Sequence, residues 1–270
     1  MTKHNIRGLN VVEYGENNSQ AVIFIHAFPL CNRMWDKQAE VLQNDYRVIT
    51  YDLRSFGYSE LGDGHFTIDT HVSDLISIID SLKIEKPVIC GLSMGGYIAL
   101  RALELYQSKF KGAILSDTKS EADNNPARIK RAEQIQQIKS GGRDQFTENF
   151  IKGALSEANF NEKPELVEFL KKMVGWQKNE AITGALLSLA ARTDTTEFLE
   201  KLDLPVLIIV GKDDRLTPPE FSKIIYGKTK NSDLKIISNS GHFPNMENPE
   251  EFNNAVAEFL KELNKPPKGQ

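Results

Sequence analysis

A serine flanked by glycines is the first candidate for chemistry in this chain. Gly91-Leu92-Ser93-Met94-Gly95 matches the pattern G-x-S-x-G, which is common by chance. Here, however, the pattern follows the apolar run Pro87–Cys90 and precedes the helical stretch Tyr97–Tyr106. A sharp turn from strand to helix strains the serine backbone, and its hydroxyl then stands at a helix N-terminus, where developing negative charge is favoured. The pattern therefore predicts a nucleophilic serine at position 93.

A serine is a weak nucleophile without an adjacent base, and the chain has five histidines. His242 follows the last apolar run and would lie at the carboxyl edge of a sheet, the same edge as Ser93. We expect His4 to lie in a mobile N-terminal segment, His65 in a loop and His71 on the solvent face of a helix. For His26 we expect a hydrogen bond that braces its loop. Position and elimination predict His242 as the base.

A carboxylate must orient such a base and stabilise its charged form. Asp214 lies in Gly211–Pro218, directly after another apolar run, so it would meet the same sheet edge. The chain order of serine, acid and histidine is one that the serine motif predicts. Asp117, at the end of the preceding run, and Asp213 are the alternatives. Asp214 is the favoured acid.

The oxyanion formed by serine attack needs N–H groups that already point at it. One is expected from Met94, the residue after the nucleophile. The other is expected from the loop after the first core strand, at Phe28. Both assignments depend on position, because a backbone donor leaves no mark in the sequence.

These residues must be positioned by strands. Six short runs rich in β-branched residues alternate with amphipathic stretches, and near-continuous apolar runs are typical of parallel strands buried on both faces. From Thr67 to Lys83, apolar residues recur at helical spacing, and Thr67 is placed to cap that helix. We predict a doubly wound, mostly parallel α/β sheet. The six predicted strands are Ala21–Ile25, Arg47–Tyr51, Pro87–Cys90, Gly112–Ser116, Pro205–Val210 and Leu234–Ser238.

One long stretch interrupts the alternation. Between 118 and 201 the periodicity is only helical, which predicts a helical lid inserted before the penultimate strand, with residues 1–117 and 202–270 forming the core. The polar end Lys265–Gln270 is expected to be frayed. Four apolar or aromatic lid residues are candidates for lining a substrate pocket: Phe146, Phe150, Trp176 and Leu187.

Taken together, these motifs and the strand pattern resemble the α/β-hydrolase superfamily, over residues 10 to 263. Within it, the segments 26–30, 52–59 and 91–96 are most similar to small bacterial carboxylesterases, 3-oxoadipate enol-lactonases and cofactor-free haloperoxidase-type esterases. The family's nucleophile, acid, base and two oxyanion donors match Ser93, Asp214, His242, Phe28 and Met94. The chain departs from the family at Ala27 and Ser55, where relatives usually carry glycine.

The resemblance implies a serine carboxylesterase that hydrolyses small, short-acyl esters through an acyl-enzyme on Ser93, without metal or organic cofactor. An enol-lactonase using the same triad is the first alternative. A perhydrolase or haloperoxidase side activity, or a ligand-binding protein that has lost turnover, are the others. Serine at position 93, where relatives that open epoxides or remove halides carry aspartate, disfavours those two reactions.

Composition limits the partners. The 270 residues carry a net charge of −4, with positive and negative residues interspersed, which disfavours a nucleic-acid surface. Cys31 and Cys90 lack the spacing of a zinc site or disulfide framework, and Cys90 is expected to be buried. No apolar run is long enough to cross a membrane, and the N-terminus lacks a secretory signal pattern. We therefore expect a cytoplasmic monomer or homodimer acting on a small molecule.

Overall fold

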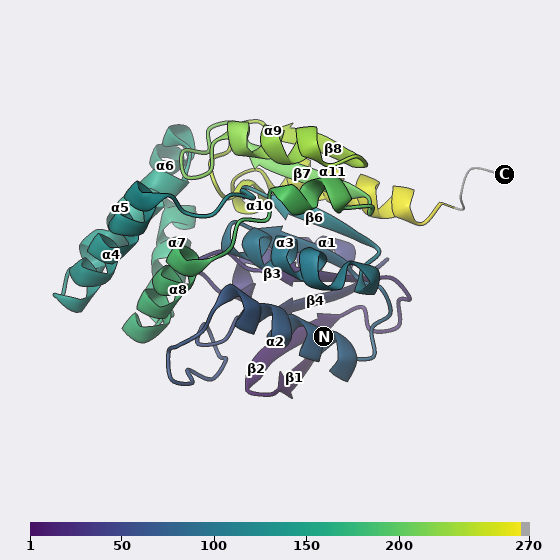
Figure 1. Cartoon of the computed structure of the whole chain (residues 1–270), viewed down its shortest axis with the longest axis horizontal. Coiled ribbons are helices and arrows are strands. Elements are labelled where there is room, and N and C mark those ends of the chain that lie inside the picture. Colours follow the sequence, from purple (N-terminus) through teal and green to yellow (C-terminus); the bar gives the residue numbers. More distant parts are fainter. Residues whose placement is uncertain (266–270) are drawn as a thin grey trace.

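A single eight-stranded sheet organises the chain in the computed structural model, which describes residues 1–265 (Figure 1). The strand order is β1-β2-β4-β3-β5-β6-β7-β8, and the six strands β3 to β8 run parallel to one another. The strands are β1 Thr2–Ile6, β2 Leu9–Tyr14, β3 Ala21–Ile25, β4 Arg47–Tyr51, β5 Val88–Leu92, β6 Gly112–Ser116, β7 Val206–Gly211 and β8 Ser232–Ile237.

All six strands predicted from apolar runs are present. Three of them, β3, β4 and β6, have the predicted bounds, whereas β5, β7 and β8 are shifted by one or two residues. Every residue of β3, β5, β6 and β7 is buried, because helices cover both faces of the sheet. The predicted fold class, a doubly wound and mostly parallel α/β sheet, is confirmed.

The N-terminal segment forms a hairpin, which corrects the expectation of a mobile end. The segment around His4 is not a mobile end but strand β1, paired antiparallel with β2, which in turn pairs antiparallel with β4. His4 Nε2 lies 2.7 Å from Glu13 Oε2 across the hairpin. Its short strand alternates between exposed and half-buried residues and so lacks the continuous apolar run that marked the others.

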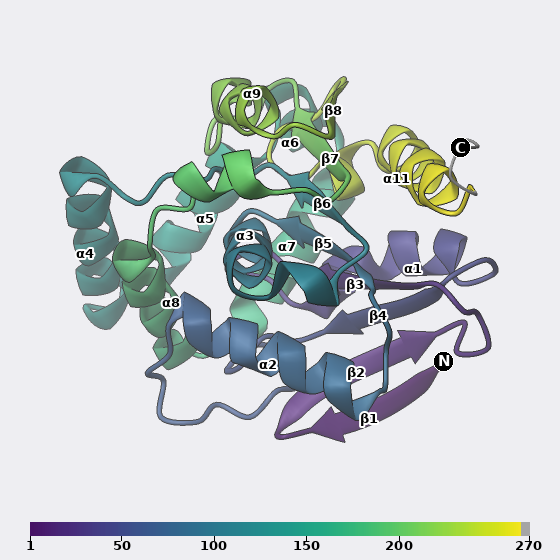
Figure 2. The ribbon, with the colours of Figure 1, turned by 45° about the vertical axis from the view of Figure 1, so that its right-hand side comes forward.

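Helices pack on both sides of the sheet. Figure 2 shows α1 (Asp36–Leu42) and α11 (Pro249–Leu263) on one side, and α2 (Ile68–Ser81), α3 (Met94–Tyr106) and α9 (Pro219–Lys228) on the other. Thr67 caps α2 as predicted, since its side chain accepts from Thr70 N–H while the Thr70 side chain accepts in return from Thr67 N–H. Both cysteines are buried and free.

The region between β6 and β7 is helical. It contains α4 (Asn125–Lys139), α5 (Arg143–Ala154), α6 (Glu157–Glu162), α7 (Pro164–Trp176) and α8 (Asn179–Ala191), followed by a short 3-10 helix, Glu197–Lys201. In Figure 1 these helices stand together at one end of the sheet, and we keep the name lid for residues 118–201. Of the predicted frayed end, residues 266–270 lie outside the described residues.

His71 corrects another expectation. Its side chain is buried in α2 rather than facing solvent, and its ring lies 4.8 Å from that of Phe66. The residue occupies the same helix face as Ile68, Val72 and Leu75, which are also buried. Burial, with the nearby charges of His26 and Arg54, lowers the pKa of His71 to about 3, so this core histidine is neutral.

Candidate active site

Ser93 lies on a strained turn between β5 and α3. Its φ of 56° and ψ of −112° fall where non-glycine residues rarely occur, and its N–H donates to Ser116 O at 2.9 Å. Two glycines allow this turn to pack. A Cβ at Gly91 would lie 2.1 Å from Gly95 O, and one at Gly95 would lie 2.2 Å from Ile25 O. The motif therefore holds Ser93 in a conformation that other residues beside it would disrupt.

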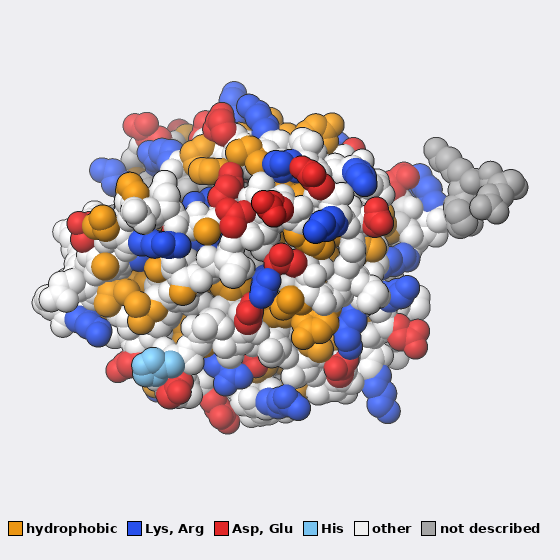
Figure 3. All heavy atoms as spheres, in the orientation of Figure 1, with side chains coloured by type: hydrophobic (Ala, Val, Ile, Leu, Met, Phe, Trp, Pro, Cys, Tyr) orange, Lys and Arg blue, Asp and Glu red, His pale blue; other side chains and the backbone are white. Residues whose placement is uncertain are grey.

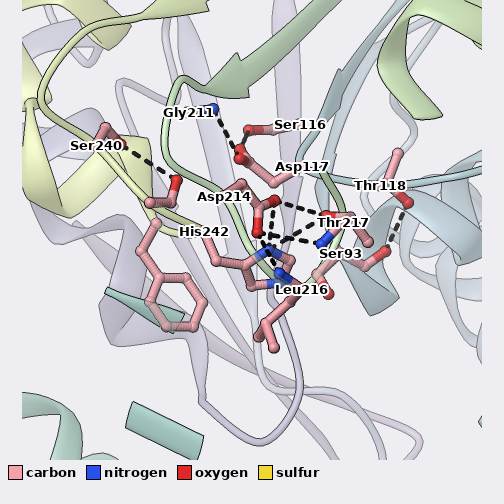
Figure 4. Close-up of polar contacts among 12 residues, drawn as sticks. Ser93, Ser116, Asp117, Thr118, Gly211, Asp214, Leu216, Thr217, Ser240 and His242 are labelled. Carbon is pink, nitrogen blue, oxygen red and sulfur yellow. Dashed lines mark hydrogen bonds and ion pairs between the residues drawn. The ribbon is translucent and has the colours of Figure 1, made fainter. Parts of the chain in front are cut away.

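His242 and Asp214 form a buried pair. His242 Nδ1 lies 2.8 Å from Asp214 Oδ2, which also accepts from Thr217 Oγ1 at 2.7 Å. The other carboxylate oxygen, Oδ1, accepts from the N–H groups of Leu216 and Thr217 at 2.8 and 3.1 Å. Since Nδ1 faces the carboxylate, Nε2 is the ring atom left for proton transfer. Figure 4 draws Ser93, Asp214 and His242 together.

Electrostatics keep Asp214 charged. Burial opposes its ionisation, but the charge of His242 and hydrogen bonds from His242 and Thr217 outweigh burial and lower the Asp214 pKa to about 2. An ionised partner of this kind fixes the imidazole orientation and stabilises the imidazolium.

The two alternative acids are placed differently. Asp213 is exposed. Asp117 is buried near the pair, but its oxygens accept from Ser116 Oγ at 2.6 Å and from Gly211 N–H at 2.9 Å. Burial and the nearby Asp214 charge raise the pKa of Asp117 well above its ordinary value, which favours the uncharged form of this second acid. The geometry favours Asp214 as the partner of His242.

Ligand atoms of Asp117, Asp214 and His242 lie within 4.8 Å of one another, a spacing that a metal ion could use. Their atoms are, however, already engaged by hydrogen-bond donors or by each other. The donor set fits a proton-linked pair better than a metal centre.

The loop carrying His242 is anchored to the lid by a residue that the sequence reading missed. Glu247, in α10 (Pro244–Glu247), is buried and accepts through Oε1 from Gly241 N–H at 2.9 Å and Phe243 N–H at 3.2 Å. Its Oε2 accepts from Ser156 N–H at 2.9 Å. In addition, His242 N–H donates to Ala154 O at 2.7 Å. An acidic residue three positions after Pro244 is the sequence signal for these contacts of Glu247.

The oxyanion role expected for Phe28 and Met94 stays a prediction, and both residues lie near Ser93. Phe28 lines the same cavity as Ser93, and Met94 is the first residue of α3, where an N–H has no acceptor within its own helix.

The two positions where relatives usually carry glycine differ in backbone conformation. Ala27 needs no glycine, since its φ is not positive, whereas Ser55 adopts a φ of 73°, where glycine is common. His26 braces its loop: Nε2 accepts from Leu53 N–H at 2.9 Å, so Nδ1–H donates to Ala27 O at 2.9 Å.

A cavity of about 210 Å³ lies between the sheet and the lid. Ser93, His242, Phe28 and Thr217 line it from the core side. The lid contributes apolar residues, including Phe150, but also several charged ones. The lid residues that line the cavity are Lys119, Asp123, Ala127, Lys130, Arg131, Gln134, Phe150 and Leu189.

Of the four predicted pocket residues, Phe150 lines this cavity and Phe146 is buried beside it, stacked on Phe150 with ring centroids 6.2 Å apart. The other two predictions need correction. Trp176 is 52% exposed and packs edge-on against Tyr58 at the surface, and Leu187 is 56% exposed. Apolar character identified these lid residues, but it does not say which helix face points inward.

The charged lining of the cavity was also missed. Ala127, Lys130, Arg131 and Gln134 are spaced by three, one and three residues, which places them on one face of α4. This spacing was visible in the sequence. The polar character of this face makes it resemble an ordinary solvent-facing helix surface.

The chain belongs to the family described as the alpha/beta hydrolase fold, which matches it over residues 20–249. It is 28% identical to 3-oxoadipate enol-lactonase 2 of Acinetobacter baylyi, covering 95% of this chain and 94% of that protein. Among solved structures, a thermophilic esterase of Thermogutta terrifontis with malate bound superposes with a TM-score of 0.93 and 31% identity, covering 98% of this chain and 100% of that one. A bromoperoxidase of Bacillus anthracis has the same fold, with a TM-score of 0.86, 24% identity, and coverage of 96% and 99%.

Within residues 1–265, none of the helices combines the length and the apolar character that a membrane span requires. On the face drawn in Figure 3, positive and negative side chains are interspersed with apolar ones.

Proposed function

We propose that this hydrolase cleaves small carboxylic esters with Ser93 as nucleophile, His242 as general base and Asp214 as the orienting acid. The observation that carries the proposal is the placement of Ser93, on a strained turn, in the same cavity as the buried His242–Asp214 pair. Nucleophile, base and orienter in this arrangement are the constellation needed for acyl transfer.

The proposed reaction has two halves. Ser93 Oγ attacks the ester carbonyl while His242 Nε2 takes its proton, and the N–H groups of Phe28 and Met94 bind the oxyanion. His242 then protonates the departing alcohol. Water, activated by the same base, hydrolyses the acyl group on Ser93 and releases the acid.

Hydrolysis of a lactone is the second candidate, because one relative of similar length is a 3-oxoadipate enol-lactonase. The same residues would open a cyclic ester, and the leaving oxygen would stay attached to the acyl chain. The short-acyl preference and the cytoplasmic location expected from the sequence stay predictions.

Replacing the nucleophile tests the proposal. Ser93→Ala is expected to lower kcat for p-nitrophenyl butyrate by up to about 10⁶-fold, the loss seen when a triad nucleophile is removed. A fluorophosphonate probe should label the native protein and not the variant. Labelling without turnover, or turnover that survives Ser93→Ala, would contradict the mechanism, and failure of both in a folded protein would favour a ligand-binding role.

A further inference from the structure

Positive charge gathers on the lid side of the Ser93 cavity. Lys130 and Arg131 reach it from the inward face of α4, between Ala127 and Gln134. Lys119 joins them from the segment after β6, and it is 17% exposed. A helix that covers a core normally turns an apolar face inward, whereas α4 turns a basic one toward the cavity.

The cations share few carboxylates. Asp123, which is 1% exposed, accepts ion pairs from Arg192 at 2.7 Å, Arg131 at 3.2 Å and Lys119 at 3.6 Å. Three positive charges thus meet one buried negative charge, and two of them, Lys119 and Arg131, line the cavity together with Asp123. Glu121 and Asp194 add some compensation, but neither lines the cavity.

Lys119 and Lys130 are the two cations most able to pair with an additional anion. Burial and the charge of Arg192 lower the pKa of Lys119, which also lies 5.2 Å from the ring of Phe221. Within residues 1–265 no ion pair of Lys130 is found, although the residue lines the cavity. Lys119 is half-buried, and such a cation without a full partner gains from an incoming anion, while the exposed Lys130 adds positive charge at the cavity mouth.

We propose that the cavity selects esters or lactones that carry a free carboxylate, bound by Lys119, Lys130 and Arg131 while Ser93 attacks the ester carbonyl. This inference rests on the proposed function and names its substrate class. In the reaction the C–O bond to the alcohol breaks as the Ser93–acyl bond forms, and the Ser93 proton passes through His242 to the leaving oxygen. Water then releases the acyl group, so the product from an acyclic monoester is a dicarboxylate.

The test uses two substrates of matched shape. Mono-p-nitrophenyl glutarate carries a carboxylate where p-nitrophenyl 5-oxohexanoate carries a methyl ketone. After subtraction of the uncatalysed rates, kcat/KM for the glutarate is expected to exceed that for the ketone by about tenfold or more, and this preference should shrink as salt screens the charges.

Substitutions test which residues cause the preference for the glutarate ester. Lys119→Gln, Lys130→Gln and Arg131→Gln should each lower the glutarate-to-ketone ratio several-fold, mainly through KM. Lys139→Gln is the matched control, because Lys139 lies in the same helix but does not line the cavity. Lys130 is exposed, so its variant carries little risk of misfolding.

The outcomes distinguish the anion site from the proposed ester hydrolysis. Equal kcat/KM values for the two substrates in the native protein would overturn the anion site while leaving Ser93-dependent ester hydrolysis intact. A preference that all three variants retain would also overturn it. If neither ester is hydrolysed through Ser93, the proposed function fails. Titration of the two intact esters into the Ser93→Ala protein then tests the anion site alone, and equal affinities would overturn it.

Discussion

Two buried carboxyl groups lie beside His242, and their surroundings push them to opposite states. Asp214 accepts from His242 and Thr217, which hold its pKa to about 2 against the effect of burial. Burial and the Asp214 charge raise the pKa of Asp117. Two negative charges at this spacing in a dry site would repel each other strongly, so ionisation of one disfavours that of the other.

This difference predicts unequal effects of amide substitution. Asp214→Asn removes the charge that orients His242 and should lower kcat about 10⁴-fold. Asp117→Asn keeps an oxygen that can accept from Gly211 N–H, at a position where burial and the Asp214 charge favour an uncharged group, so kcat should change by less than about tenfold. Steady-state kinetics on p-nitrophenyl butyrate measures both, and circular dichroism checks the folds. A larger loss from Asp117→Asn would assign the acid to the end of β6.

Buried His71 predicts how stability depends on pH. Its folded pKa is about 3 against an ordinary value of 6.5, so between these pH values the unfolded chain binds a proton that the folded protein does not. The free energy of unfolding should therefore fall as pH decreases below 6.5, by up to about 1.4 kcal/mol per pH unit from this residue.

His71→Leu should remove that part of the pH dependence between pH 5 and 6.5, measured by urea unfolding at each pH. His65→Leu provides the control for replacing a histidine by leucine, because the His65 side chain is exposed. Equal slopes for the native protein and His71→Leu would mean that the folded protein protonates His71 without penalty.

At the scale of elements, the turn from β5 to α3 has no room for a side chain on its glycines. An alanine at position 95 would place its Cβ 2.2 Å from the carbonyl oxygen of Ile25 in β3. Because that oxygen belongs to the backbone of a buried strand, neither partner can move cheaply. The geometry of Ser93 thus depends on contact between two strands and one helix.

Gly95→Ala is expected to lower the free energy of unfolding by about 1–3 kcal/mol, and to reduce kcat further by displacing Ser93. Gly227→Ala in α9 is the matched control, because a Cβ there meets nothing within 4 Å and alanine favours helices by about 0.5–1 kcal/mol. Unfolding curves and esterase rates of both variants measure the effect. A Gly95→Ala protein with native stability and rate would mean that the turn relaxes freely.

Across the whole molecule, the sequence predicted what depends on continuous apolar runs and missed what depends on orientation. The parallel strands follow from the apolar runs. The sheet edge where Ser93, Asp214 and His242 meet follows because each of these residues comes shortly after such a run. Strand β1 was missed because a half-exposed strand needs no such run, and β2 was missed because Asn10 and Glu13 interrupt its apolar residues. The inward face of α4 and the outward placement of Trp176 were missed because each depends on how the lid helices pack against the core.

The cavity between lid and core predicts a limit on acyl length, which is a property of both parts together. Core residues such as Ser93 and lid residues such as Phe150 line a space of about 210 Å³. An acyl chain that overfills such a space loses roughly 1–3 kcal/mol per misfitting methylene. For uncharged p-nitrophenyl esters, kcat/KM should therefore peak between acetyl and butyryl and be very low for palmitoyl.

A series of these esters, with Ser93→Ala as the blank, measures the length profile, and an enol-lactone belongs in the same panel. Faster turnover of long chains, or activation at a lipid interface, would contradict an enclosed cavity, because such substrates need a lid that opens. If the lactone exceeds the best simple ester by orders of magnitude, the ester activity is secondary. In that case the same three residues act on a ring, and the leaving oxygen stays attached to the acyl chain, so the shape of the ring rather than acyl length would decide the choice of substrate.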